Sequence, residues 1–102
     1  MNFHPKDLPI SNTYDLKDEK EASEAVEEMV KLGFSDKKGF RVLFPKESRT
    51  AKRIGYTITT GVTHGLKQKK EVPDIRYWTY HHDDDHYAIV LIGNDALSEL
   101  GF

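Results

Sequence analysis

Apolar residues recur at helical spacing between residues 16 and 32, and they define the clearest predicted element of the chain. The apolar positions are three or four residues apart, and charged residues occupy the opposite side. Asp18 followed by Glu21 resembles a capping box with Asp in place of Ser or Thr, and Gly33 suits the left-handed position that ends a helix. The sequence therefore predicts an amphipathic helix, whose apolar face consists of Ala22, Ala25, Val26, Met29, Val30 and Leu32.

Two segments in the middle of the chain predict strands. Residues 40–44 alternate between apolar and polar positions and stop at Pro45. Residues 53–62 predict a longer strand because apolar residues occupy even positions and small polar residues occupy odd ones. Between the two, residues 46–52 predict a loop or a short helical turn. The apolar face predicted for the longer strand consists of Ile54, Tyr56, Ile58 and Val62.

The C-terminal third predicts two more strands and a short helix. Residues 75–80 are rich in aromatic and β-branched residues, which favour strands. Residues 86–92 are almost continuously apolar, which is typical of a central strand covered on both faces. Asn94 suits the start of a short C-terminal helix. Together, the predicted helices and strands indicate an α+β domain in two layers, with the N-terminal helix packed on a mainly antiparallel sheet of about four strands.

The first 14 residues show no periodicity, and they predict an N-terminal tail or strap that precedes a single domain over residues 15–102. The length of 102 residues suits one domain. The absence of cysteine excludes disulfides, thiolate catalysis and cysteine-based zinc sites. Without an apolar run that could span a bilayer or the layout of a signal peptide, we expect a cytoplasmic protein with no membrane association.

Charge is segregated along the chain, although the formal net charge is only −2. Residues 36–70 carry a net charge of +8, whereas residues 1–35 carry −4 and residues 71–102 carry −6. The basic block predicts a local positive potential that suits phosphate groups, if the folded sheet brings these side chains together. The alternative is a set of solvated loops whose lysines protect a sheet edge. The predicted nucleic-acid contacts are Arg41, Arg49, Lys52, Arg53, Lys67, Lys69 and Lys70, with Tyr56 or Trp78 as stacking residues.

A protein partner is the second hypothesis. Glu24, Glu27 and Glu28 lie on the charged side of the 16–32 helix and form an acidic surface that an inhibitor or adaptor would present to a basic protein. An aromatic face of the predicted sheet could also bind a protein, or close a homodimer. The alternative is that these glutamates bind nothing, because glutamate is a good helix former and is common on exposed helix positions.

Residues 81–86, with the sequence His-His-Asp-Asp-Asp-His, form the most unusual local string. Imidazole and carboxylate groups bind Zn²⁺, Ni²⁺ or Mn²⁺ when three of them converge. The alternatives are a polar hairpin tip, and a pH-sensitive turn in which carboxylates raise the histidine pKa values. The predicted ligands are His81, His82, Asp84 and His86.

The chain contains none of the familiar catalytic or phosphate-binding motifs, and no spacing selects a catalytic constellation. The sequence resembles no family that we recognise. We expect a small binding or regulatory module that contacts a macromolecule, without a cofactor, in preference to an enzyme.

Overall fold

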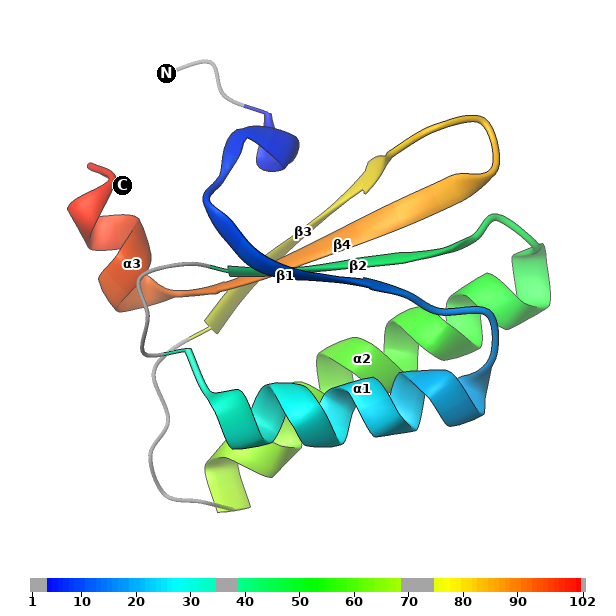
Figure 1. Ribbon diagram of the computed structural model, residues 1–102, viewed down its shortest axis with the longest axis horizontal. Coiled ribbons are helices and arrows are strands. Elements are labelled where there is room, and N and C mark those ends of the chain that lie inside the picture. Colours follow the sequence, from blue (N-terminus) through cyan, green and yellow to red (C-terminus); the bar gives the residue numbers. More distant parts are fainter. Residues whose placement is uncertain (1–3, 35–38, 69–74, 102) are drawn as a thin grey trace.

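The computed structural model describes residues 4–34, 39–68 and 75–101 (Figure 1). Helices and strands alternate along the chain, and the last two strands form a hairpin. The elements are η1 (Pro5–Asp7), β1 (Ile10–Asp15), α1 (Glu19–Leu32), β2 (Gly39–Pro45), α2 (Ser48–Gln68), β3 (Ile75–His81), β4 (His86–Gly93) and α3 (Asn94–Glu99).

The four strands form one mixed sheet in the order β1-β2-β4-β3. β1 pairs with β2 in parallel, and β4 pairs antiparallel with both β2 and β3. β2 and β3 therefore run in the same direction, with β4 between them. The fold is α+β with a mostly antiparallel sheet, as the sequence predicted.

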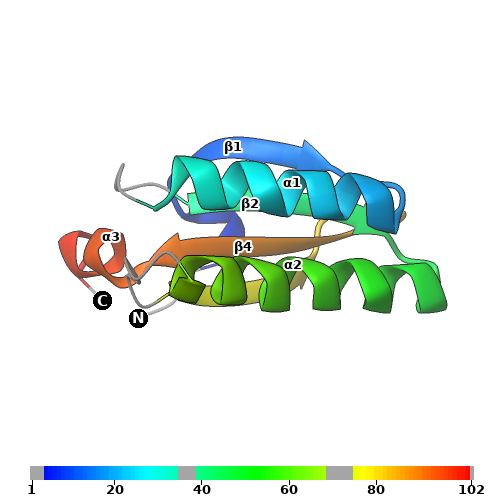
Figure 2. The same ribbon diagram turned by 90° about the horizontal axis from the view of Figure 1, so that it is seen from below.

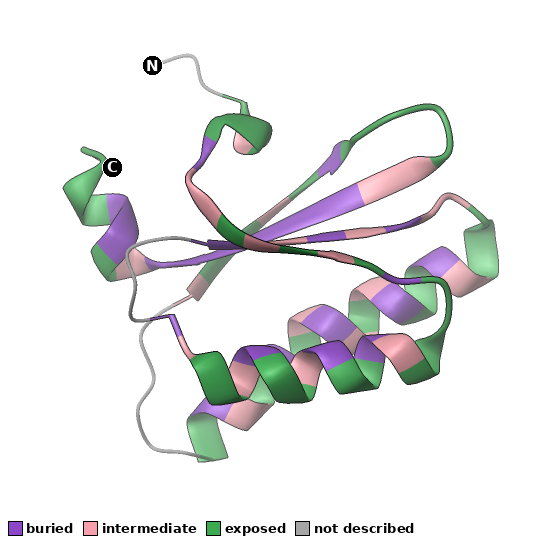
Figure 3. Cartoon of the chain, in the orientation of Figure 1, coloured by how far each residue is buried: buried purple, intermediate pink, exposed green. Residues whose placement is uncertain are grey.

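The sheet carries apolar side chains on both faces. α1 and α2 lie side by side on one face, and η1 and α3 lie toward the other (Figures 1 and 2). On the helix side, Ile89 and Leu91 of β4 join a core with both long helices. On the opposite side, Val90 and Ile92 pack with Leu97 of α3. The prediction that β4 is a central strand covered on both faces is confirmed, and Figure 3 shows the buried residues along it.

α1 begins and ends as its sequence predicts. The Asp18 carboxylate accepts a hydrogen bond from the Glu21 amide at 2.9 Å, and the Glu21 carboxylate accepts one from the Lys17 amide at 2.7 Å. The first bond satisfies an amide of the first helical turn that has no partner within the helix, and the second joins the residue before the cap to the helix. Gly33 ends the helix with a φ of 71°, a conformation that glycine adopts without strain.

The strand predicted over residues 53–62 is wrong, because these residues lie inside the 21-residue helix α2. Ile54, Ile58 and Val62 do share a buried face, but they do so on a helix that also buries Ala51 and Leu66. Tyr56 was expected beside the isoleucines, yet 71% of it is exposed. A spacing of four residues fits both a strand, with its period of two, and a helix, with its period of 3.6.

The N-terminal segment contributes a strand that the sequence analysis did not predict. Ile10–Asp15 pairs with β2 and forms one edge of the sheet, so the sheet has four strands although one predicted strand is helical. The strands predicted over residues 40–44, 75–80 and 86–92 and the short C-terminal helix are confirmed. Within the described residues, no helix is long and apolar enough to cross a membrane.

Candidate functional site

The outer face of α2 is the most strongly basic surface element among the described residues. Its 21 residues contain no aspartate or glutamate. The residues exposed on this face recur every three or four positions, so they form a stripe opposite the buried side. At 1.5 Å per residue, the helix is about 30 Å long. We call this surface the basic stripe; its members are Arg49, Lys52, Arg53, Tyr56 and Lys67.

One cation of the basic stripe has a nearby carboxylate. The Arg53 Nε atom lies 3.7 Å from Glu19 Oε1 at the start of α1, and both side chains are more than half exposed. An exposed pair at this distance contributes at most about 1 kcal/mol, so it neutralises Arg53 only in part. Tyr56 lies among these cations with most of its ring in solvent.

A groove of about 380 Å³ lies between α2 and the edge strand β3. Lys67 belongs to both the groove and the basic stripe, so the two surfaces are continuous. Tyr77 of β3, which is 57% exposed, lines the groove on the sheet side. The described residues that line the groove include no carboxylate; they are Thr59, Thr60, Thr63, His64, Lys67 and Tyr77.

Two of the three threonines that line the groove direct their hydroxyl hydrogens to carbonyl groups of α2. Thr63 Oγ1 donates to the Thr59 carbonyl at 2.8 Å, and Thr59 Oγ1 donates to the Gly55 carbonyl at 3.0 Å. Their hydroxyl oxygens therefore remain as acceptors. His64 Nε2 lies 2.9 Å from the side-chain nitrogen of Gln68, one turn further along α2.

Other predicted nucleic-acid contacts lie on the opposite face of the sheet. Arg41 alternates with the helix-facing residues of β2, and its guanidinium donates to the Lys6 carbonyl at 3.1 Å. Trp78 is half-buried against the core that includes α3, and Arg76 lies 5.8 Å from the centroid of its ring. Neither Arg41 nor Trp78 belongs to the surface formed by α2. Lys69 and Lys70 lie outside the described residues.

The three glutamates of the protein-partner hypothesis are exposed on α1. Glu24, Glu27 and Glu28 lie on the helix next to α2, so an acidic and a basic helix lie side by side (Figure 2). Glu28 also lies near Tyr14 of β1: burial, and to a smaller extent the charge of Glu28, raises the pKa of the Tyr14 hydroxyl.

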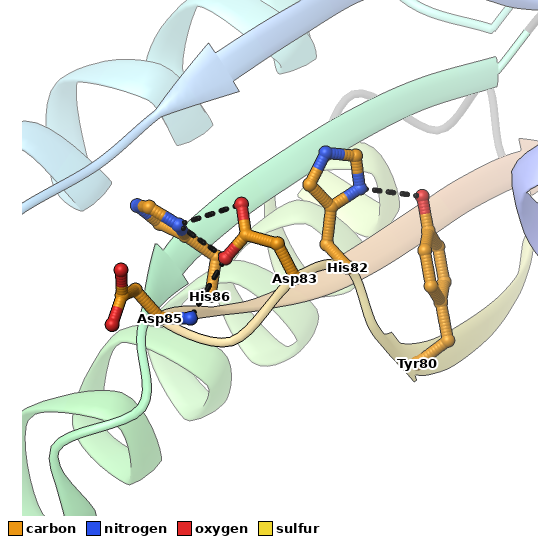
Figure 4. Close-up of polar contacts among 5 residues, drawn as sticks. All are labelled: Tyr80, His82, Asp83, Asp85 and His86. Atoms are coloured by element: carbon orange, nitrogen blue, oxygen red, sulfur yellow. Dashed lines mark hydrogen bonds and ion pairs between the residues drawn. The ribbon is translucent and has the colours of Figure 1, made fainter.

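The string of residues 81–86 forms the tip of the β3–β4 hairpin (Figure 4). His86 Nδ1 contacts the Asp83 carboxylate at 2.9 Å and 3.1 Å, and His82 Nδ1 instead lies 3.3 Å from the Tyr80 hydroxyl. His81 packs against the Tyr87 ring, with 4.7 Å between centroids.

These contacts separate the predicted metal ligands His81, His82, Asp84 and His86. Among the described residues, no three histidine, aspartate or glutamate side chains come together as a metal site. The hydrogen bond between Asp83 and His86 raises the pKa of the imidazole and lowers the pKa of the carboxyl. The tip thus holds a hydrogen-bonded pair of Asp83 and His86, and the metal site that was one of the alternatives from the sequence is not formed by the described residues.

The groove was not predicted from the sequence. In the structure Tyr77 is exposed toward α2, whereas Tyr80 is buried and packs with Trp78 on the opposite face of the sheet. A helical projection of residues 48–68 carries the signal, because it puts Thr60, Thr63 and Lys67 on the side opposite the aliphatic residues. The position of Tyr77 beside them depends on the sheet order.

No protein-family model, curated protein or solved structure matches this chain.

Proposed function

We propose that this protein binds nucleic acid through the basic stripe of α2, as a stoichiometric binding module. The observation that carries the proposal is a 21-residue helix whose exposed face bears four cations and which contains no carboxylate, in a protein whose net charge is −2. Cations concentrated on one side of an acidic protein attract phosphate locally, although the molecule as a whole repels it.

The spacing of the cations along the basic stripe suits an extended nucleic-acid backbone. Arg49 and Lys67 are 18 residues apart, which corresponds to about 27 Å along the helix axis. A nucleic-acid strand following α2 meets cations near both ends and Tyr56 between them. α1, which carries five glutamates and two lysines, lies along one flank of α2, so we expect the strand to be directed toward the flank beside β3.

Fluorescence anisotropy with labelled single-stranded and double-stranded oligonucleotides tests the proposal. We expect binding at about 50 mM salt that weakens steeply toward about 200 mM, since phosphate contacts release counterions. Replacing Arg49, Lys52 and Lys67 together by glutamine should reduce the slope of log K against log salt by about 2–3.

A variant with glutamine at Lys6, Lys20 and Lys31 is the matched control. It changes the net charge by the same amount, but its substitutions lie on η1 and α1. We expect it to bind like the parent protein. Absence of binding at about 50 mM salt, where electrostatic attraction is strongest, overturns the proposal, as does equal weakening in both variants.

A protein partner that binds the acidic face of α1 is the second candidate. Glu24, Glu27 and Glu28 are exposed and lie on one helix. Affinity purification with and without nuclease treatment separates the two candidates. A partner that survives nuclease treatment and is lost when these three glutamates are replaced by glutamine favours the protein partner.

A further inference from the structure

We infer that the groove between α2 and β3 receives an unpaired nucleobase, so that the preferred ligand is single-stranded nucleic acid. This inference rests on the proposed function and specifies the ligand of the same surface. It arises from one juxtaposition: an exposed aromatic ring on an edge strand lies beside Lys67, near the C-terminal end of α2.

Tyr77 is available for stacking because of its position in the sheet. β3 is an edge strand, and it pairs only with β4 within the described residues. The neighbouring residues Trp78 and Tyr80 pack on the opposite face, which leaves Tyr77 on the side of the long helices. With 57% of its surface exposed, Tyr77 contributes little to the core and can stack with a base.

The other residues of the groove complement a nucleotide. The Lys67 ammonium supplies a charge for the phosphate, and it continues the basic stripe into the groove. The Thr59 and Thr63 hydroxyl oxygens face a ligand as acceptors, because their hydrogens are engaged by the helix backbone. Acceptors of this kind pair with amino groups of bases or with a ribose 2′-hydroxyl.

A duplex does not fit this arrangement equally well. Paired bases are stacked inside the helix, and moving one of them outward costs unpairing and unstacking energy. A single strand exposes its bases without this cost. The basic stripe alone accepts either form, since phosphate contacts do not depend on pairing. The groove is therefore the feature that separates single strands from duplexes.

The experiment compares the affinities of oligo(C), oligo(dC) and a duplex, each about 12 units long, for the full chain. The variants are Tyr77→Ala, Tyr77→Phe, which keeps the ring, and Tyr56→Ala, which removes the other exposed tyrosine on this surface. We expect single strands to bind at least about tenfold more tightly than the duplex. Tyr77→Ala should remove most of that preference, and Tyr77→Phe should retain it.

Thermal unfolding of each variant checks that the fold is intact. Tighter binding of oligo(C) than of oligo(dC) assigns the threonine oxygens to a 2′-hydroxyl, and equal binding excludes the 2′-hydroxyl as their partner and leaves the base amino group; both results support the inference. Duplex binding equal to single-strand binding, or a Tyr77→Ala variant with an unchanged preference, overturns it while the proposed function stands. If none of the three ligands binds at low salt, the proposed function itself fails.

Discussion

Gly65 of α2 lies so close to Val30 of α1 that a β-carbon at Gly65 would be only 2.7 Å from Val30 Cγ2. One turn earlier, a β-carbon at Gly61 would be 3.0 Å from Val26 Cγ1. Two glycines four residues apart thus let two valines of the neighbouring helix approach the backbone of α2. Valine has one preferred rotamer in a helix, so it cannot turn away from a larger residue.

Replacing Gly65 by alanine should destabilise the protein. Alanine alone stabilises a helix by about 1 kcal/mol relative to glycine, but forcing a methyl group into this contact costs about 1–3 kcal/mol. We expect a net loss of about 1 kcal/mol, measured by urea denaturation, and a melting temperature lower by about 4–8 °C.

Gly55→Ala is the control in the same helix. Its β-carbon would lie 3.7 Å from Ile89 and 3.8 Å from Phe44, which are ordinary contact distances. Here the helix propensity prevails, and stability should rise by about 0.5–1 kcal/mol. If both alanine variants raise the melting temperature equally, the close contact between α1 and α2 is incorrect.

Substitutions at Tyr56 and Ile58 distinguish the helix from the strand that the sequence suggested. Tyr56 is 71% exposed and Ile58 is fully buried, so Tyr56→Ala should change stability by less than about 0.5 kcal/mol. Ile58→Ala should cost about 2–5 kcal/mol because it leaves a cavity in the core. Chemical denaturation measures both. Comparable losses at the two positions would indicate that they share a buried face, as in a strand.

Removing the cap of α1 should weaken the protein through a single hydrogen bond. Asp18→Ala leaves the Glu21 amide without its acceptor, which costs about 1 kcal/mol. Asp18→Asn keeps an acceptor oxygen and should retain most of the stability. Thermal unfolding of the two variants measures the difference, and equal losses would show that the charge of Asp18, and not its hydrogen bond, stabilises the helix.

The ion pair at the hairpin tip should give His86 a raised pKa that depends on Asp83. The bonded carboxylate favours the protonated imidazole and raises the pKa of His86. In an Asp83→Asn variant the pKa of His86 should fall, as measured by NMR titration of the imidazole. An unchanged titration would show that the contact is absent in solution.

The same pair defines a pH window for its small contribution to stability. His86 contributes fully below the ordinary pKa of histidine, and its contribution disappears as the pH rises through the raised pKa. Asp83 contributes above the ordinary pKa of aspartate, and this contribution disappears as the pH falls through its lowered pKa. The stability of the parent protein should therefore decline as the pH rises through the raised pKa of His86 and as it falls through the lowered pKa of Asp83. Both declines should be smaller in Asp83→Asn.

The position of the N-terminal segment could not be predicted from local pattern. Its alternation is weak: Ile10 and Tyr14 are half-buried, and Ser11 and Thr13 are exposed. The segment pairs with β2, which is distant in the sequence. The Ser11 hydroxyl donates a hydrogen bond of 3.2 Å to the carbonyl of Gly39, which comes 28 residues later in the chain. Parallel pairing needs a crossover, here α1, and no short turn marks it in the sequence.

By itself, the sequence determined the features that depend on neighbouring residues: the limits of α1 through Asp18 and Gly33, the run of β4, and the concentration of cations between residues 36 and 70. Tertiary structure decided the features that join distant segments. Ile54, Ile58 and Val62 fit a strand or a helix equally well, and packing against α1 across Gly61 and Gly65 favours the helix. Once α2 is a helix, its cations form one stripe, Arg41 and Trp78 lie on the far face of the sheet, and Tyr77 completes the groove.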